Sequence, residues 1–75
     1  MEGKNKQRVI ELIKNNPQGL TIQEIADKLV LSRITVSIVL AELKGEHLIE
    51  IREVGQAKLH YWKKGGEENG KWKNN

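Results

Sequence analysis

The chain has 75 residues, enough for one small domain with a modest core. A domain of this size buries only about 60% of the surface that its unfolded chain exposes, so an enclosed active site is not expected. The absence of cysteine excludes a disulfide scaffold, a thiolate zinc site and a cysteine nucleophile. No apolar run approaches the ~20 residues that span a bilayer, and the charged N-terminus lacks the apolar segment of a signal peptide. We therefore expect a cytoplasmic protein with no membrane partner.

The net charge of +3 is by itself a weak indication of a nucleic-acid partner, because much of it lies at the C-terminus. Residues 1–62 hold nine basic and eight acidic residues, a net charge of +1, whereas residues 63–75 hold four lysines and two glutamates, a net charge of +2. The placement of charge must therefore indicate the partner. Residues 65–75 are polar and rich in glycine, which predicts a disordered tail after a domain of residues 1–64.

Three helices are predicted in the first part of the chain. The first covers about residues 5–15, where apolar residues recur at helical spacing before a turn of Asn, Pro and Gly. The second begins at Thr21, because Thr21 and Glu24 have the spacing of a capping box. The third begins at Ser32, a favourable N-cap residue, and ends near residue 44 or 45. The short connection between the last two helices forces a sharp crossing, as in a helix-turn-helix.

From residue 48 the composition and spacing of the sequence are typical of a β-hairpin. Residues 48–54 are rich in β-branched side chains, residues 55–57 form a turn, and residues 58–63 form a second strand. A very short additional strand is expected near Leu20. The fold class is therefore α+β, with three helices followed by a two-stranded hairpin.

Alternation along the second strand predicts that Leu59 and Tyr61 join the core and that Trp62 faces away from it. His47 and His60 are far apart in the sequence and do not have the spacing of metal ligands. We therefore expect no metal site.

This order of elements resembles the winged-helix transcription regulators, above all the compact domains of bacterial and archaeal MarR-like and ArsR-like regulators. The resemblance covers roughly residues 5–63 and implies a helix-turn-helix with a hairpin wing. It is carried by the run Gly19-Leu20-Thr21-Ile22-Gln23-Glu24-Ile25-Ala26-Asp27-Lys28-Leu29, then Leu31-Ser32, Thr35-Val36-Ser37, Leu40, Leu43 and Leu48-Ile49-Glu50.

The resemblance implies a transcription regulator that binds double-stranded DNA. Helix 32–44 would enter the major groove, and the wing turn at residues 55–58 would reach the backbone or the minor groove. The start of the second helix would contact a phosphate through free backbone N–H groups. The residues implied to lie at the DNA are Thr21, Gln23, Ser32, Arg33, Ile34, Thr35, Ser37, Ile38, Arg52, Gln56 and Lys58.

The outer face of the third helix departs from this pattern. At ~100° per residue, Ile34, Ile38 and Ala41 lie opposite the core-facing residues, at positions that are usually polar or basic in DNA-binding relatives. One interpretation is that the two isoleucines contact thymine methyl groups. The alternative is that the stripe binds a protein, including a second copy of this chain, so that the domain is an interaction or dimerisation module.

An enzymatic function is not expected. The serines of the third helix have no histidine partner in the pattern, and the glycine motifs of phosphate and dinucleotide sites are absent from the sequence. The sequence therefore predicts neither a catalytic residue nor a cofactor.

Overall fold

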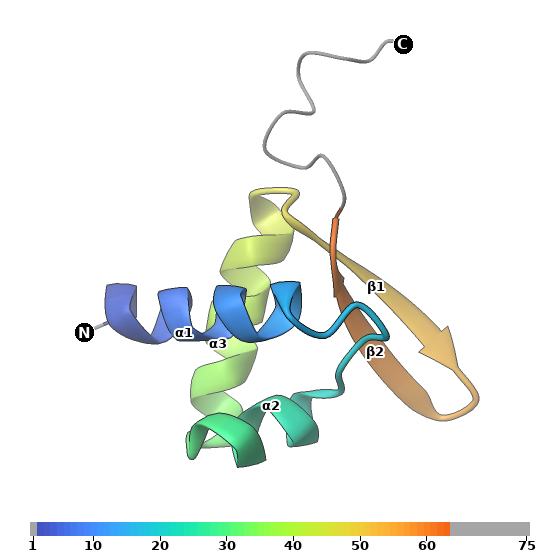
Figure 1. Cartoon of the computed structure of the whole chain (residues 1–75), viewed down its shortest axis with the longest axis horizontal. Coiled ribbons are helices and arrows are strands. Elements are labelled where there is room, and N and C mark those ends of the chain that lie inside the picture. Colours follow the sequence, from blue (N-terminus) through green and yellow to red (C-terminus); the bar gives the residue numbers. More distant parts are fainter. Residues whose placement is uncertain (1, 64–75) are drawn as a thin grey trace, which may run out of the picture.

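The computed structural model describes residues 2–63, in which three helices pack together and a β-hairpin projects from them (Figure 1). This confirms the predicted winged-helix fold; the predicted tail at residues 65–75 lies outside the described residues. No helix in residues 2–63 combines the length and the apolar character needed to cross a membrane. The elements are α1 (Glu2–Lys14), α2 (Ile22–Leu29), α3 (Arg33–Gly45), β1 (Ile49–Val54) and β2 (Ala57–Trp62).

Local sequence fixes the starts of α2 and α3. The amide of Glu24 donates to Oγ1 of Thr21 at 3.1 Å, and the amide of Thr21 donates to Oε1 of Glu24 at 2.9 Å, which completes the predicted capping box. At α3, the amide of Thr35 donates to Oγ of Ser32 at 3.1 Å. Both predicted N-caps are therefore confirmed.

The first helix begins earlier than predicted, at Glu2 rather than near residue 5. Its first turns are polar, so no apolar periodicity marks them in the sequence. A tertiary contact accompanies the extension, because Nζ of Lys6 lies 2.8 Å from Oε2 of Glu46, just beyond the end of α3. A contact between residues 40 positions apart thus accompanies the longer helix.

The turn between α2 and α3 is held by a left-handed residue. Val30 has φ 58° and ψ 51°, and the amide of Leu31 donates to the carbonyl of Ala26 at 2.9 Å. From α1, Nη2 of Arg8 donates to the carbonyl of Leu29 at 2.8 Å. These bonds satisfy carbonyls at the C-terminus of α2 and set the sharp crossing of the helix-turn-helix.

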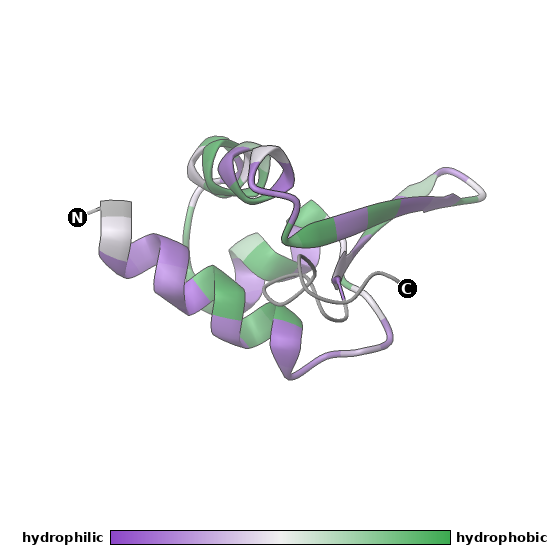
Figure 2. Ribbon diagram, turned by 90° about the horizontal axis from the view of Figure 1, so that it is seen from above, coloured by the Kyte–Doolittle hydropathy of each residue, from purple (hydrophilic) through white to green (hydrophobic). Residues whose placement is uncertain are grey.

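The core is aliphatic, as the composition requires, and is shared by all three helices and the first strand. In Figure 2, α3 is seen almost end-on, with the other two helices on one side and the hairpin extending away. Four residues of α3 belong to the core, which makes it the central element of the domain. The buried hydrophobic residues are Val9, Ile13, Leu20, Ile25, Ala26, Val36, Val39, Leu40, Leu43 and Ile49.

The hairpin has a shorter loop than predicted. Val54 pairs with Ala57, so only Gly55 and Gln56 connect the strands, and β2 begins one residue earlier than expected. Gly55 has φ +64° and Gln56 has no positive φ, a combination typical of a type II′ hairpin turn. The expected short strand near Leu20 is present as an isolated antiparallel bridge to His60.

The predicted facing of β2 is wrong. His60 is the buried residue of this strand, with 3% of its surface exposed, and Trp62 packs partly against the core. Because the bridge to Leu20 turns His60 toward the helices, alternation places Leu59 and Tyr61 on the opposite face. Hydrophobicity alone favoured burial of the other face of β2. A hydrogen bond to the backbone carbonyl of Leu20 satisfies the imidazole of His60 in the interior.

Candidate nucleic-acid interface

The outer face of α3 is exposed and apolar at its centre. Ile34 and Ile38 expose 74% and 53% of their surface, and Ala41 is also exposed. They lie opposite the buried residues of the same helix, as the helical spacing predicts. One helix thus supplies both the centre of the core and an exposed apolar surface.

Four of the predicted site residues lie together where α2 and α3 begin. Nη1 of Arg33 donates to Oε1 of Gln23 at 3.2 Å, which joins the two helices near their N-termini. The hydroxyl of Ser32 donates to Oγ1 of Thr35 at 3.0 Å. The structure therefore brings the predicted polar residues of both helices to one end of the helix-turn-helix.

Thr21 is already engaged in the cap of α2. Its hydroxyl accepts the amide of Glu24, and the carboxylate of Glu24 lies at the same helix end. A phosphate at this place would depend on the backbone N–H groups of Ile22 and Gln23, which precede the first intrahelical bonds. Its role at DNA stays a prediction, and the side chain of Thr21 has a structural role in any case.

A shallow groove of about 210 Å³ separates the C-terminal half of α3 from the wing. It brings together Ser37 and Lys58, two predicted site residues that are 21 positions apart in the sequence. Lys44 also lines the groove, so two lysines reach it from two different elements. The lining residues are Ile22, Ser37, Leu40, Ala41, Lys44, Ile51, Lys58 and His60.

Sequence reasoning missed Lys44 as a member of this surface. A usable signal was present, because Lys44 is seven residues after Ser37 and therefore about two helical turns along the same side of α3. The position of the wing beside that side, which only the tertiary structure supplies, shows that Lys44 and Lys58 line one groove.

Arg52 and Gln56 lie apart from this groove. Arg52 is on the opposite face of the hairpin, where Nε lies 3.3 Å from Oε2 of Glu50 and the guanidinium stacks over Tyr61 at 5.4 Å from the ring centroid. Gln56 is exposed at the tip of the wing. The structure therefore does not bring Arg52 together with Lys58.

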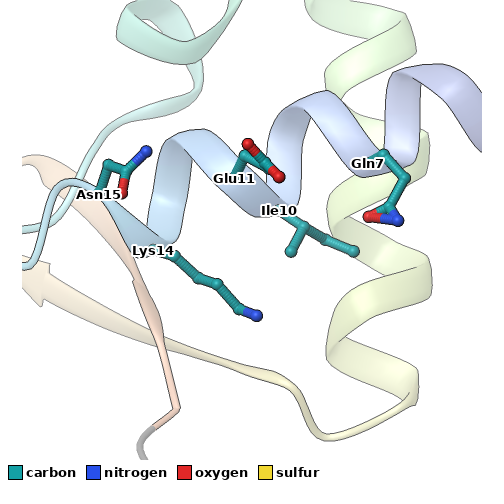
Figure 3. A pocket seen from close by; sticks show the side chains of 5 residues that line it. All are labelled: Gln7, Ile10, Glu11, Lys14 and Asn15. Carbon is teal, nitrogen blue, oxygen red and sulfur yellow. The ribbon is translucent and has the colours of Figure 1, made fainter.

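A second hollow lies along α1, on a different part of the surface (Figure 3). It is about 350 Å³ in volume and is lined only by α1 and the residue that follows it. Its charged members are Glu11 and Lys14, and Nζ of Lys14 lies 4.7 Å from the ring centroid of Trp62. Among residues 2–63, no three His, Asp or Glu side chains are grouped so that they could hold a metal ion. This hollow gives no indication of catalytic chemistry.

Comparison with solved structures identifies the same fold in two transcription regulators. The transcriptional regulator SlyA superposes with a TM-score of 0.71 at 19% identity, over 87% of this chain and 46% of that one. MepR, a transcription regulator of the Staphylococcus aureus multidrug efflux pump MepA, superposes with a TM-score of 0.69 at 26% identity, over 85% of this chain and 48% of that one.

These matches confirm the resemblance to MarR-like regulators at the level of the fold, which is a winged helix. The chain spans about half the length of the two solved structures that it matches. No family model matches the sequence, and no curated protein matches it.

Proposed function

We propose that this chain binds double-stranded DNA as a transcription regulator, with α3 in the major groove and the wing on the backbone or in the minor groove. The observation that carries the proposal is the exposed outer face of α3 within a fold shared with two transcription regulators. An α-helix fits the width of the major groove of B-DNA. Such a protein would act in the cytoplasm, without a catalytic step or a cofactor.

The arrangement of the other elements supports the proposal. In Figure 1, α2, the N-terminal half of α3 and the tip of the hairpin lie toward the same end of the molecule. Arg33 at the start of α3 and the pair of lysines beside the wing add positive charge on both sides of the apolar centre. Contacts of these side chains with phosphates would set the register of the helix in the groove.

The salt dependence of binding to a duplex of mixed sequence tests this function. With ~3–5 phosphate contacts, the logarithm of the association constant should fall with the logarithm of salt concentration at a slope of roughly −3 to −4.5. Fluorescence anisotropy with a labelled duplex measures this slope. Failure to bind duplex DNA at low salt would refute the proposal.

Charge-removing variants identify the contacts. Arg33→Gln, Lys44→Gln and Lys58→Gln should each weaken binding and reduce the magnitude of the salt slope by about 1. Lys4→Gln is the matched control, because Lys4 is an exposed lysine on α1. Equal slopes for the control and the three variants would place the DNA on another surface.

A second candidate function is favoured by the same exposed isoleucines. An interaction module would use Ile34, Ile38 and Ala41 to bind another protein or a second copy of this chain. Ile38→Arg separates the two candidates, because a guanidinium should preserve or tighten DNA binding but abolish an apolar contact. Sedimentation of both proteins, with and without a duplex, measures the outcome. Full retention of protein association by the variant would exclude the stripe as the interface.

A further inference from the structure

The centre of the outer face of α3 has little capacity for hydrogen bonding to bases. Between Arg33 and Lys44 the helix has no basic residue. The guanidinium of Arg33 contacts Gln23, and the hydroxyl of Thr35 contacts Ser32. The exposed hydroxyl of Ser37 lies on the wing side of the face, in the groove with Lys58. The groups that usually distinguish base edges therefore lie at the margins of the face or are bonded to other side chains, while its centre consists of aliphatic groups.

These aliphatic groups have a regular placement along the helix. Ile34, Ile38 and Ala41 are separated by four and three residues, so they form one row about 10 Å long at 1.5 Å per residue. Successive base pairs of B-DNA are about 3.4 Å apart along a strand. The row therefore spans about three base pairs when the helix lies along the major groove.

Charge and area favour DNA over a second copy as the occupant of this row. Arg33 and Lys44 lie near its ends, and Lys58 lies across the adjoining groove. In a two-fold dimer through this face, the cations of one protomer would lie close to the cations of the other and repel them. A polyanion such as DNA would instead neutralise them. Three side chains, one of them alanine, also fall well short of the ~800 Å² per partner that a stable protein interface buries.

The carboxylate of Glu42, at the border of the row, lies close to a lysine of α1. Oε1 of Glu42 lies 3.8 Å from Nζ of Lys6 of α1, and Lys6 also binds Glu46. Two acidic residues at the C-terminal end of α3 are thus partly neutralised on the α1 side. On the side of the wing the row is bordered by Lys44 and Lys58, and the exposed Glu53 pairs with Lys58 across the hairpin.

From these observations we infer that Ile34 and Ile38 read the 5-methyl groups of pyrimidines, so that the preferred target contains thymines over about three adjacent base pairs. This inference rests on the proposed function. The thymine methyl group is the apolar feature of the major groove, and it contacts aliphatic side chains favourably. Specificity would then come from methyl contacts, and affinity from Arg33, Lys44 and Lys58.

The test compares two duplexes that differ only in this methyl group. One is a 20-base-pair duplex of alternating adenine and thymine, and the other has the same sequence with deoxyuridine in place of every thymine. Base pairing, hydrogen-bonding groups and phosphates are the same in both. Removal of a buried methyl group should weaken binding about fourfold for each contact. In a second pair of duplexes, 5-methylcytosine should strengthen binding to a guanine–cytosine sequence relative to cytosine.

The matched variants assign the effect to the row. The double variant Ile34→Ala/Ile38→Ala should lose most of the preference for the thymine duplex over the uracil duplex, because the shortened side chains reach less far into the groove. Alanine favours the helix, so folding is preserved. Val54→Ala is the control, since Val54 is an exposed aliphatic residue of the hairpin and its variant should keep the thymine preference. Helical content from circular dichroism checks the fold of each variant.

The possible outcomes separate the inference from the function on which it rests. Equal binding of the thymine and uracil duplexes by the unaltered chain would overturn methyl reading and leave DNA binding intact. An undiminished thymine preference in the double variant would also overturn it, because another element would then read the methyl groups. Failure to bind any duplex would refute the proposed function itself.

Discussion

Leu20 and His60 are joined by three hydrogen bonds that connect the wing to the helix-turn-helix. The amide of His60 donates to the carbonyl of Leu20 at 2.8 Å, and the amide of Leu20 donates to the carbonyl of His60 at 3.2 Å. Nδ1 of His60 lies 2.9 Å from the same carbonyl of Leu20. Because a carbonyl only accepts, this contact assigns the proton to Nδ1. Two backbone bonds and one buried imidazole therefore hold the wing against the segment that precedes α2.

Replacement of this imidazole should destabilise the domain. His60→Ala removes a buried side chain and its hydrogen bond, which should lower the free energy of unfolding by about 2 kcal/mol or more. His60→Asn should lose less, because its side-chain amide can donate from nearly the same place as Nδ1. Urea denaturation measures both. Lys58→Ala is the control at an exposed neighbour on the strand, and an equal loss in all three variants would contradict this account.

Gly19 cannot accept a side chain. Its φ is +94°, and a Cβ atom there would lie 2.7 Å from Cζ of Tyr61. Gly19→Ala should therefore destabilise the domain by about 2 kcal/mol, from backbone strain and from displacement of the tyrosine ring. Gly45→Ala is the control, because nothing lies within 4 Å of its added Cβ and the residue is helical. Gly45→Ala should have an unchanged or slightly higher melting temperature in thermal denaturation. A loss of stability equal to that of Gly19→Ala would refute the explanation.

The left-handed valine after α2 offers a stabilising substitution. Val30 has φ 58° and is 86% exposed, so its branched side chain adds backbone strain and little packing. Val30→Gly should raise stability by about 1 kcal/mol and the melting temperature by about 4–8 °C. Val54→Gly, at an exposed position in a strand, should instead lower stability. A lower melting temperature for Val30→Gly would contradict this explanation, because the packing of the valine side chain would then contribute more than the backbone strain costs.

The pKa of Lys6 should report the contact between α1 and the end of α3. The hydrogen bond to Glu46 raises the pKa of Lys6 above 10.5, with smaller Coulombic contributions from Glu46 and Glu42, against a lowering by desolvation. Because the pKa is raised in the folded state, the associated stabilisation is present below the unfolded value and is lost as pH rises through the folded value. It is modest, since Lys6 is open to solvent screening.

An NMR titration of the Lys6 side chain measures this contact. Glu46→Gln should move the pKa of Lys6 downward, because the charged partner and its hydrogen bond are lost. Glu50→Gln should leave it unchanged, because Glu50 pairs with Arg52 on the hairpin. An unchanged titration in Glu46→Gln would mean that the ion pair is not formed in solution.

Local signals in the sequence determined the fold. The capping box at Thr21, the N-cap at Ser32 and the short connection between their helices depend on residues within a few positions of one another, so they can be read without tertiary information. Helical periodicity likewise predicted the exposure of Ile34 and Ile38, because the buried and exposed sides of a helix follow from spacing alone.

The tertiary structure decided which face of the wing packs and which side chains meet there. His60 rather than Leu59 is buried, since a carbonyl 40 residues away satisfies its ring, and hydrophobicity cannot anticipate such a partner. The same register places Lys58 beside Lys44 and separates it from Arg52. Because strand side chains alternate, this one long-range pairing decides which residues of β2 face the helices, and with them the border of the proposed DNA-binding face.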